Sequence, residues 1–445
     1  MGVAQPQGRS VALIGAYERD NFGDLLFLIV TETLLARRGA ITQATGPFPA
    51  DMTDLLDRHI PSLGACLRSE RFDAIWTVGG ELGGITLPTA YRMSATDNDW
   101  EAYRRLSVRQ RAMRLMEITD GASLQLAYIP QMSESWWSRT RIPLVVNSVG
   151  LHGARRLRPR IKRELVKTLR NSAGVSVRDR VSSEWLNRYS IDHLLAPDVV
   201  HLLPNVHPVR QAVADDRAIL QVSRVHLTRF GMDKIVDLVA MPLMRRFREV
   251  RIVRAGAARG HDPSEELHRL AEIVNARVGG RRMELSPARR PLDIVDEIAC
   301  SGLWLGSSMH GRIVAAAYEV PRISFASTKV DAYASQWDAD MPFRIMPQDL
   351  NEALSSIPSA QERGRLSEVS QGLADLATSN FVRMTTRIEE CDAGKPRGRP
   401  TSSTVSQPRV RSYGTDLRRE IRWQKLKDIA SRARLLAGTS TKGGS

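Results

Sequence analysis

A histidine and an arginine occupy positions where an anionic substrate could be bound and protonated. His310 follows an apolar run at residues 303–306, where a strand is expected to end and a helix to begin. Backbone N–H groups and the helix dipole at such a point favour an anion, and the near-neutral pKa of imidazole suits proton transfer. Arg178 carries a guanidinium group that can hold a carboxylate or phosphate through two hydrogen bonds, with a salt bridge to Asp179 as the competing explanation.

Three polar turns offer further candidates. Asn21 and Asp24 follow the first expected strand. Asp24 could orient a hydroxyl group or act as a base, but both side chains could instead close the turn and cap the next helix. Gly79 and Gly80 follow a later strand and would let backbone amides approach a ligand, with a plain tight turn as the alternative. His152 follows a third strand, and we expect it to face the same cleft.

The elements that would position these residues alternate between strand and helix. Apolar runs at residues 72–78 and 142–149 each end in a glycine-rich turn, as does the first strand at residues 10–15. Strands that alternate with helices indicate parallel sheets. Ligands of open α/β sheets bind where the carboxyl ends of strands meet such turns, so we expect the candidate residues to converge on one cleft.

The length of 445 residues exceeds what one hydrophobic core usually spans. We therefore expect an N-terminal Rossmann-like lobe at residues 10–205, a C-terminal Rossmann-like lobe at residues 206–390, and a tail at residues 391–445. The tail is strongly basic and rich in Pro, Gly and Ser, so we expect it to be largely disordered. Leu and Ile recur at helical spacing over residues 417–436, which predicts a basic amphipathic helix. That helix could lie on an anionic membrane surface, stay solvated or pack on another chain.

Composition and missing motifs argue against several classes of protein. No apolar run reaches the roughly 18–20 residues of a membrane span, and three widely separated cysteines offer neither a disulfide framework nor a zinc site. Both observations favour the cytoplasm. The sequence has no GxxxxGK(S/T), GxGxxG, HExxH or GxSxG motif, and no cofactor or metal is expected. The tail contains no sequence-reading DNA module, so nucleic acid is not expected as a partner.

The order and separation of five short segments resemble those of the polysaccharide pyruvyl transferase family. The segments are residues 21–24 (N-F-G-D), 79–80 (G-G), 176–179 (S-V-R-D), 196–198 (A-P-D) and 308–311 (S-M-H-G). The resemblance covers roughly residues 11–334 and implies two Rossmann-like lobes arranged as in the glycosyltransferase-B class, with a cleft between them. It also implies transfer of pyruvate from phosphoenolpyruvate onto hydroxyls of a hexose in an exopolysaccharide or cell-wall glycan precursor, where the pyruvate forms a ketal.

The resemblance further implies roles for the candidate residues. His310 and Asp24 would be catalytic. The substrate would be bound by Asn21, Gly79, Gly80, His152, Arg178, Ser308, Met309 and Arg312. The partners would be phosphoenolpyruvate and a sugar or lipid-linked oligosaccharide acceptor. A lipid-linked acceptor would place the protein at the inner face of the membrane, where the basic tail would add a peripheral contact.

One position departs from the family pattern. Members usually carry an arginine two residues before the histidine, where this chain has Ser308. Arg312, two residues after the histidine, is the next basic residue and could substitute for it. Two other hypotheses stay open: a nucleotide-sugar glycosyltransferase of similar fold, and a non-catalytic family member whose tail tethers the chain to a membrane or partner.

Overall fold

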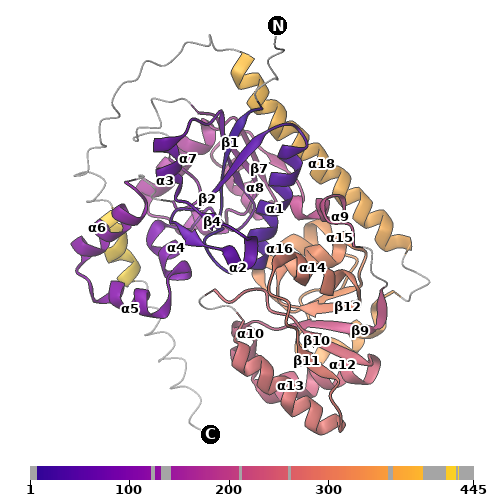
Figure 1. The fold of residues 1–445 in the computed structure, drawn as a ribbon. Helices are drawn as coiled ribbons and strands as arrows, with labels where there is room; N and C mark the ends of the chain where they lie inside the picture. Colours follow the sequence, from indigo (N-terminus) through magenta and orange to yellow (C-terminus); the bar gives the residue numbers. More distant parts are fainter. Residues whose placement is uncertain are drawn as a thin grey trace.

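The computed structural model consists of two α/β lobes that lie side by side (Figure 1). It describes residues 8–121, 126–131, 142–209, 213–258, 262–358, 364–393, 417–426 and 429. Each lobe is built on a parallel sheet covered by helices, and this confirms the predicted α/β class with two Rossmann-like lobes.

The sheet of the first lobe has six parallel strands in the order β2-β1-β5-β6-β7-β8. Its strands are β1 (Ser10–Ile14), β2 (Ile41–Thr45), β5 (Ala74–Val78), β6 (Leu144–Val149), β7 (Gly174–Val177) and β8 (Leu194–Leu195), connected through α1 (Phe22–Ala36), α3 (Leu63–Ser69), α7 (Pro159–Arg170) and α8 (Arg180–Asn187). The central strands β5 and β6 are buried along their whole length. Their nearly continuous apolar runs fit a sheet that is covered on both faces.

The sheet of the second lobe has five parallel strands in the order β11-β10-β9-β12-β13. Its strands are β9 (Ala214–Gln221), β10 (Glu249–Ile252), β11 (Met283–Leu285), β12 (Ser301–Gly306) and β13 (Arg322–Ser324), with the main helices α13 (Ser264–Val278), α14 (Pro291–Ala299), α15 (Met309–Ala317) and α16 (Thr328–Trp337). The chain passes from one sheet to the other between Leu195 and Ala214.

Shorter elements fill the connections between these strands and helices. In the first lobe they are β3 (Ala50–Asp51), α2 (Thr53–Leu56), β4 (His59–Ile60), α4 (Leu87–Ser94), α5 (Asp97–Arg105), α6 (Val108–Ile118), η2 (His152–Arg156), η3 (Val199–Leu202) and α9 (Leu203–Val206). In the second lobe they are α10 (Arg224–Phe230), α11 (Met232–Ile235), η4 (Val236–Ala240), α12 (Met241–Arg246), η5 (Pro347–Asp349) and α17 (Leu350–Ser356). Strands β3 and β4 pair antiparallel.

In both sheets the strand order reverses at one point. The reversal lies between β1 and β5 in the first lobe and between β9 and β12 in the second. At such a point the two flanking loops leave the sheet in opposite directions and open a crevice at the carboxyl ends of the strands. The loops that follow β1 and β12 carry most of the candidate residues.

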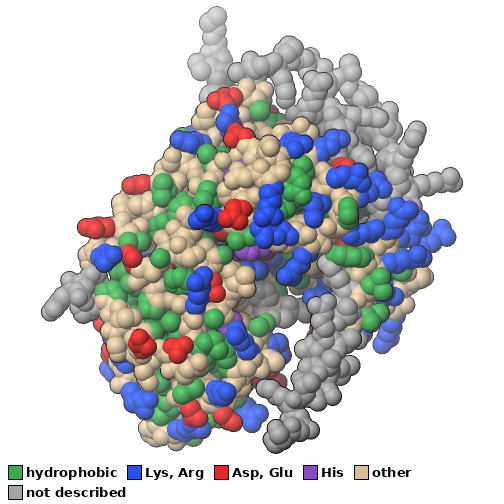
Figure 2. Space-filling model, turned by 180° about the vertical axis from the view of Figure 1, so that it is seen from behind, with side chains coloured by type: hydrophobic (Ala, Val, Ile, Leu, Met, Phe, Trp, Pro, Cys, Tyr) green, Lys and Arg blue, Asp and Glu red, His purple; other side chains and the backbone are tan. Residues whose placement is uncertain are grey.

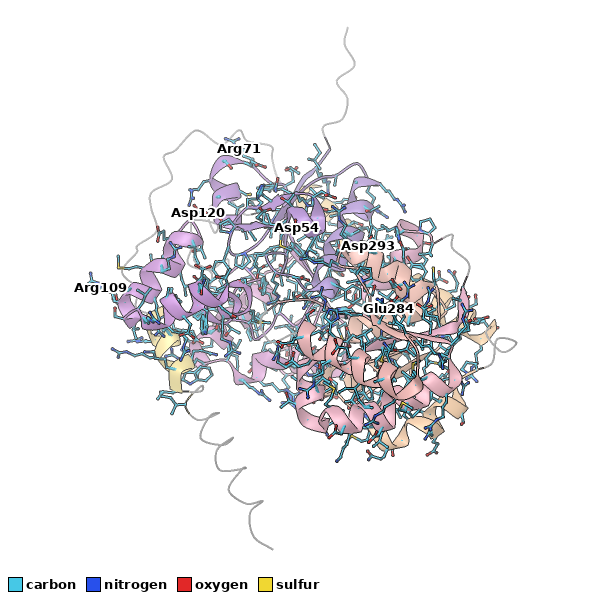
Figure 3. All side chains as sticks on the ribbon, turned by 60° about the horizontal axis from the view of Figure 1, so that its bottom comes forward. Asp54, Arg71, Arg109, Asp120, Glu284 and Asp293 are labelled. Carbon is cyan, nitrogen blue, oxygen red and sulfur yellow. The ribbon has the colours of Figure 1, made fainter. Side chains whose placement is uncertain are left out.

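Direct contacts join the two lobes beside these loops. The Phe22 amide donates to the Ala255 carbonyl at 2.9 Å, and the Ala258 amide donates to the Asp20 carbonyl at 3.0 Å. Farther out, Arg290 at the start of α14 forms an ion pair with Asp57 at the end of α2, at 2.6 Å. Figure 3 labels Asp54 on α2 and shows this helix at the edge of the first lobe that faces the second. The start of α1 therefore lies directly against the second lobe.

A long helix, α18 (Gly364–Ala393), leaves the second lobe and packs along the first (Figure 1). The Phe381 ring lies 5.5 Å from that of Trp76 in β5, and the Asn380 amide donates to Asn147 Oδ1 at 2.7 Å. Met384 packs so closely on β7 that a Cβ at Gly174 would lie 2.9 Å from its sulfur. The second lobe predicted at residues 206–390 thus ends in a helix that completes the core of the first.

The predicted amphipathic helix of the tail is present over residues 417–426 and packs on the first lobe. Leu417 and Ile421 are buried in the core there, whereas Leu426 is exposed. Glu420 forms an ion pair with Arg158 at the start of α7. Of the rest of the tail, for which disorder was predicted, residues 391–393 form the end of α18, and the remainder lies outside the described residues apart from position 429. The first part of the apolar face, Leu417 and Ile421, therefore packs within the chain itself.

Basic side chains gather on this side of the first lobe. Figure 2 shows Lys and Arg in larger numbers than Asp and Glu there, and Arg109 on α6 points away from the body in Figure 3. The exposed members on α7, on the turn before it and on the tail helix are Arg155, Arg156, Arg160, Arg163, Lys167, Arg170, Arg419, Arg422 and Lys425. We call these nine residues the basic face.

Neither a membrane span nor a metal cluster is found in the described part of the chain. None of its helices is both long and apolar enough to cross a membrane. No group of three or more His, Cys, Asp and Glu side chains in it is placed to hold a metal ion.

Candidate active site

His310 lies at the interface between the lobes, in the first turn of α15. Its ring meets the Phe27 ring edge to face at 5.0 Å, and a Cβ added at Gly23 would lie only 1.8 Å from its Nδ1 atom. Its Nε2 atom is buried, and no described residue forms a hydrogen bond with it. A helix start from each lobe, α1 and α15, therefore encloses one imidazole that still has a free ring nitrogen.

The surroundings of His310 keep its imidazole neutral. Burial lowers the pKa of His310 to about 3, and the positive charges of Arg178 and Lys329 act in the same direction. The carboxylate of Asp24 opposes them. A neutral imidazole surrounded by cations becomes basic enough to take a proton once an anion binds beside it. This electrostatic setting suits a proton donor that is switched on by its substrate.

Gly79 shapes the loop behind His310. It has a φ of +61°, and a Cβ at this position would lie 2.2 Å from the Phe27 ring that supports the histidine. Its amide donates to the Asn147 carbonyl at 2.9 Å. Gly80, with a φ of +74°, continues the turn. The geometry therefore favours the tight-turn interpretation over amide binding of a ligand by Gly79.

Asn21 and Asp24 have the capping and pairing roles that were one of the two predicted alternatives. The Asn21 side chain accepts from the Gly23 amide at 3.2 Å and caps α1. Asp24 is buried and accepts from Arg19 Nη2 at 2.8 Å and from Nε at 3.2 Å. Asp24 thus holds Arg19 beside the start of α1. The negative charge of Asp24 also acts to raise the pKa of His310.

Arg178 is buried between the lobes and pairs with Asp198, not with its neighbour Asp179. Its Nη1 lies 3.2 Å from Asp198 Oδ2, and its carbonyl accepts from the indole N–H of Trp337 at 2.8 Å. Burial raises the pKa of Asp198 to about 6, against the opposing effect of Arg178. The pair connects the end of β7 to the crossover after β8, and the positive charge of Arg178 lowers the pKa of His310.

His152 lies on the first-lobe side of the same region. Its Nε2 is 3.0 Å from Asp179 Oδ1, and this hydrogen bond raises the pKa of His152. Asp179 in turn caps α8 by accepting from the Ser182 amide at 2.8 Å. Glu81, the acidic residue of the glycine run, accepts from the Gly153 amide at 3.0 Å. His152 therefore belongs to a hydrogen-bonded network that joins η2 to α8 and to the glycine turn after β5.

The structure does not support substrate binding by Arg312 or Met309. Arg312 is 1% exposed, its Nε lies 2.7 Å from Asp338, and its other nitrogens donate to Ser324 and three backbone carbonyls. Met309 packs into the core between the lobes. The expectation that Arg312 could replace the missing arginine is corrected, because every polar group it has is used inside the second lobe. Ser308 accepts from the Gly311 amide at 3.2 Å and caps α15.

Glu18, which follows β1, is a candidate acid or base that the sequence did not single out. Burial raises its pKa to about 7, and Tyr128 donates a 2.6 Å hydrogen bond to its Oε1 atom. Together with Arg19 it borders a cavity of about 410 Å³ between the lobes, and the residues of the second lobe that line this cavity include Ala258 and Arg289. In the sequence, a carboxyl group in this polar turn cannot be told from its charged neighbours. Only the fold shows that Glu18 is buried at a cavity.

Lys329 was also missed, although its position carried a signal. It lies in the first turn of α16, just after β13, and β13 pairs with β12, the strand that leads to His310. The side chain is exposed, and it interacts electrostatically with Glu81, Arg178 and Asp24. A lysine directly after a strand end at the same sheet edge as His310 fits the rule that predicted the other candidates.

A comparison with known protein families finds one family whose sequence model matches part of this chain. The sequence model of the polysaccharide pyruvyl transferases matches residues 131–328, so the predicted resemblance is confirmed for this part of the chain. The match includes His152, Arg178 and His310, whereas Asp24 and the glycine turn lie before it. No curated protein sequence matches the chain.

Solved structures share the two-lobed fold at low sequence identity. A putative UDP-N-acetylglucosamine 2-epimerase from Listeria monocytogenes is 12% identical with a TM-score of 0.54, covering 89% of this chain and 100% of the other. A complex of S. aureus MnaA with UDP is 10% identical with a TM-score of 0.51, at the same coverage of both chains. At these identities the likeness concerns the fold alone, and it confirms the predicted glycosyltransferase-B-like arrangement.

Proposed function

Residues 131–328 match the polysaccharide pyruvyl transferases, and from this premise we propose that the protein transfers pyruvate from phosphoenolpyruvate to hydroxyls of a hexose. The observation that carries the proposal is His310: a neutral, largely enclosed imidazole with a free Nε2 at the start of α15 and three charged neighbours. A trianionic donor is the kind of ligand that would raise the pKa of this imidazole and make it an acid.

The reaction needs one acid and one base. His310, protonated when the donor binds, gives its proton to the methylene carbon of phosphoenolpyruvate and converts it to a methyl group. A sugar hydroxyl oxygen bonds to C2 and loses its proton to the base. A second hydroxyl then displaces phosphate by bonding to the same carbon, and its proton leaves with the phosphate. A diol and phosphoenolpyruvate thus become a cyclic ketal and inorganic phosphate.

The base in this proposal is Glu18. A carboxyl group with a pKa near 7 is half ionised at neutral pH and can accept a hydroxyl proton. The cavity of about 410 Å³ that it borders has room for a hexose, and its polar lining includes Asp20 and Asp54. In this arrangement Asp24, predicted as catalytic, acts through Arg19 by holding it between the cavity and His310.

The acceptor we propose is a hexose in an exopolysaccharide or cell-wall glycan precursor that is carried on a lipid. The basic face supports this part of the proposal. Its arginines and lysines lie on one side of the first lobe, where they would be attracted to anionic lipid headgroups. A protein held there from the cytoplasm would reach a sugar at the membrane surface.

Titration calorimetry with phosphoenolpyruvate at low salt tests the donor. The wild-type protein should bind phosphoenolpyruvate, and His310→Ala should bind it more weakly while a nucleotide sugar gives no heat. If the nucleotide sugar binds and phosphoenolpyruvate does not, the protein is a glycosyltransferase. If neither binds to a well-folded sample, the chain is a non-catalytic member of this fold.

A further inference from the structure

A second cavity lies where the tail helix packs against the first lobe. It has a volume of about 330 Å³, which gives room for a sugar residue. The tail contributes Ile421, Gln424, Lys425 and Ile429 to its lining, and the other lining residues come from α4, α5 and α6. Figure 1 shows the tail helix in yellow beside α5 and α6. We call this space the tail cavity, and it shares no lining residue with the cavity beside Glu18 that we propose for the acceptor.

The lining of the tail cavity is basic. Its charged residues are Arg92, Arg104, Arg111 and Lys425, and no acidic side chain of the described residues lines it. Arg111 is buried and donates to the carbonyls of Arg104 and Leu106, so these hydrogen bonds leave its positive charge uncompensated. Lys425 is exposed and forms no ion pair with a described residue, whereas Arg104 pairs with Glu101 on its own helix. The excess of positive charge favours an anionic ligand.

An aromatic wall accompanies this charge. Trp100 lines the tail cavity, and its ring stacks on the Tyr103 ring with the centroids 5.5 Å and the planes 22° apart. Tyr103 is buried, with the Tyr91 ring at 4.8 Å and the guanidinium carbon of Arg111 at 5.4 Å from its centroid. These contacts fix the indole ring at the cavity wall. The C–H groups of a sugar ring pack on an aromatic side chain of this kind, while charged substituents on the sugar need polar partners nearby.

The tail cavity and the acceptor cavity lie on adjacent sides of α4. Arg92 lines the first and Met93 lines the second, and consecutive residues of a helix point about 100° apart. The lining of the acceptor cavity includes four acidic and two basic residues, so its net charge is opposite to that of the tail cavity. Neighbouring cavities of opposite charge suit two different sugars of one chain, a neutral hexose beside Glu18 and an anionic sugar beside Trp100.

We propose that the tail cavity binds a sugar that carries a carboxylate and belongs to the glycan whose hexose is bound beside Glu18. The indole of Trp100 packs on the sugar ring, and the exposed side chains of Arg92 and Lys425 bind the carboxylate. A pyruvate ketal also carries a carboxylate, so a sugar modified in an earlier round fits the same cavity. The inference rests on the proposed function for the identity of the glycan, but binding of the anionic sugar is measured without any transfer.

Calorimetry with a trisaccharide of galacturonic acid, and with its methyl ester as the uncharged counterpart, tests the tail cavity. The wild type should bind the acid at least about 10-fold more tightly than the ester. Trp100→Leu should weaken the acid about 10-fold, and the double change Arg92→Gln and Lys425→Gln should weaken it about 5- to 10-fold. The control pair Lys234→Gln and Arg269→Gln, exposed on the second lobe, should bind as the wild type does. Equal melting temperatures show that folding is unchanged.

The outcomes separate this inference from the proposed function. No binding of the acid, equal binding of acid and ester, or unchanged affinity in both tail-cavity variants overturns the inference. Displacement of the acid by UDP also overturns it, because the cavity would then be a nucleotide site. Phosphoenolpyruvate should bind Trp100→Leu as it binds the wild type. If the wild type binds the acid through Trp100 but does not bind phosphoenolpyruvate, the tail cavity stands as a site for an anionic sugar and the proposed donor is wrong.

Discussion

At the scale of single residues, the absence of a side chain at position 23 is what lets His310 rest against the first lobe. Its ring fills the space where a Cβ would be, and the Phe27 ring supports it from the side. The loop glycine Gly79 makes room for Phe27 in turn. A short series of contacts thus fixes the imidazole, and a change at any step should displace it.

Gly23→Ala should reduce transfer about 100-fold, because a shift of roughly 1 Å in a catalytic group has an effect of that order. The rate of phosphate release in the presence of an acceptor measures it. Gly372→Ala is the matched control: this glycine lies on α18 with open space around it, and alanine there should stabilise the helix by about 0.5–1 kcal/mol. A folded Gly23→Ala protein with full activity would contradict the proposed position of His310.

Glu18→Gln should slow transfer by about 100-fold or more and leave the affinity for phosphoenolpyruvate unchanged, because it removes the base and not the donor site. In the wild type, kcat/KM should fall as the pH drops below about 7, since the raised pKa means that Glu18 is protonated there and cannot accept a proton. This limb of the pH profile should vanish in the variant. Glu368→Gln, an exposed change on α18, should keep the profile.

Residue types and spacing were sufficient to place His310 and Arg178 just after strand ends, because a strand end followed by a helix start is visible in a sequence. They could not show which carboxylate Arg178 pairs with, since Asp198 lies 20 residues away and reaches it only through the sheet. Arg312 was assigned to the substrate for the same reason: its partner Asp338 lies 26 residues further along the chain. Which carboxylate an arginine pairs with depends on the tertiary structure.

At the scale of elements, the alternation of strands and helices predicted the parallel sheets. It did not predict that α18 returns to the first lobe. The helix is amphipathic, and its apolar face indicates burial without indicating against which sheet. Only the contacts of Phe381 with Trp76 and of Asn380 with Asn147 settle the question.

Phe381→Ala should lower the free energy of unfolding by about 3–5 kcal/mol, as for other large residues truncated in a core. Leu376→Ala, on the half-exposed side of the same helix, should change it by no more than about 0.5 kcal/mol. Urea denaturation followed by circular dichroism measures both. Equal, small effects would mean that α18 is not part of the first core.

At the scale of the whole molecule, the positive charge is distributed unevenly. The basic face joins α7 and the tail helix, which are linked by the Arg158–Glu420 ion pair. Sequence composition showed that the tail is basic but could not show that it folds back beside a second basic helix. The two together make a surface that neither has alone.

Sedimentation with anionic vesicles tests that surface. Removing two charges with Arg163→Gln and Lys167→Gln should weaken vesicle binding about 30-fold at low salt, at about 1 kcal/mol per charge. Removing two from the second lobe with Lys234→Gln and Arg269→Gln should have much less effect. Binding that is insensitive to salt, or equally reduced by both pairs, would argue against the basic face as the membrane contact.

The return of α18 also has a consequence for synthesis. Domains generally fold as units while the chain emerges from the ribosome, the N-terminal one first. Here the core of the first lobe includes Phe381, Met384 and Ile388, which are made after the entire second sheet. The core of the first lobe therefore stays incomplete, with the Trp76 side of its sheet uncovered, until α18 has been translated. Nascent chains that stall within the second lobe should be the ones that chaperones and proteases recognise.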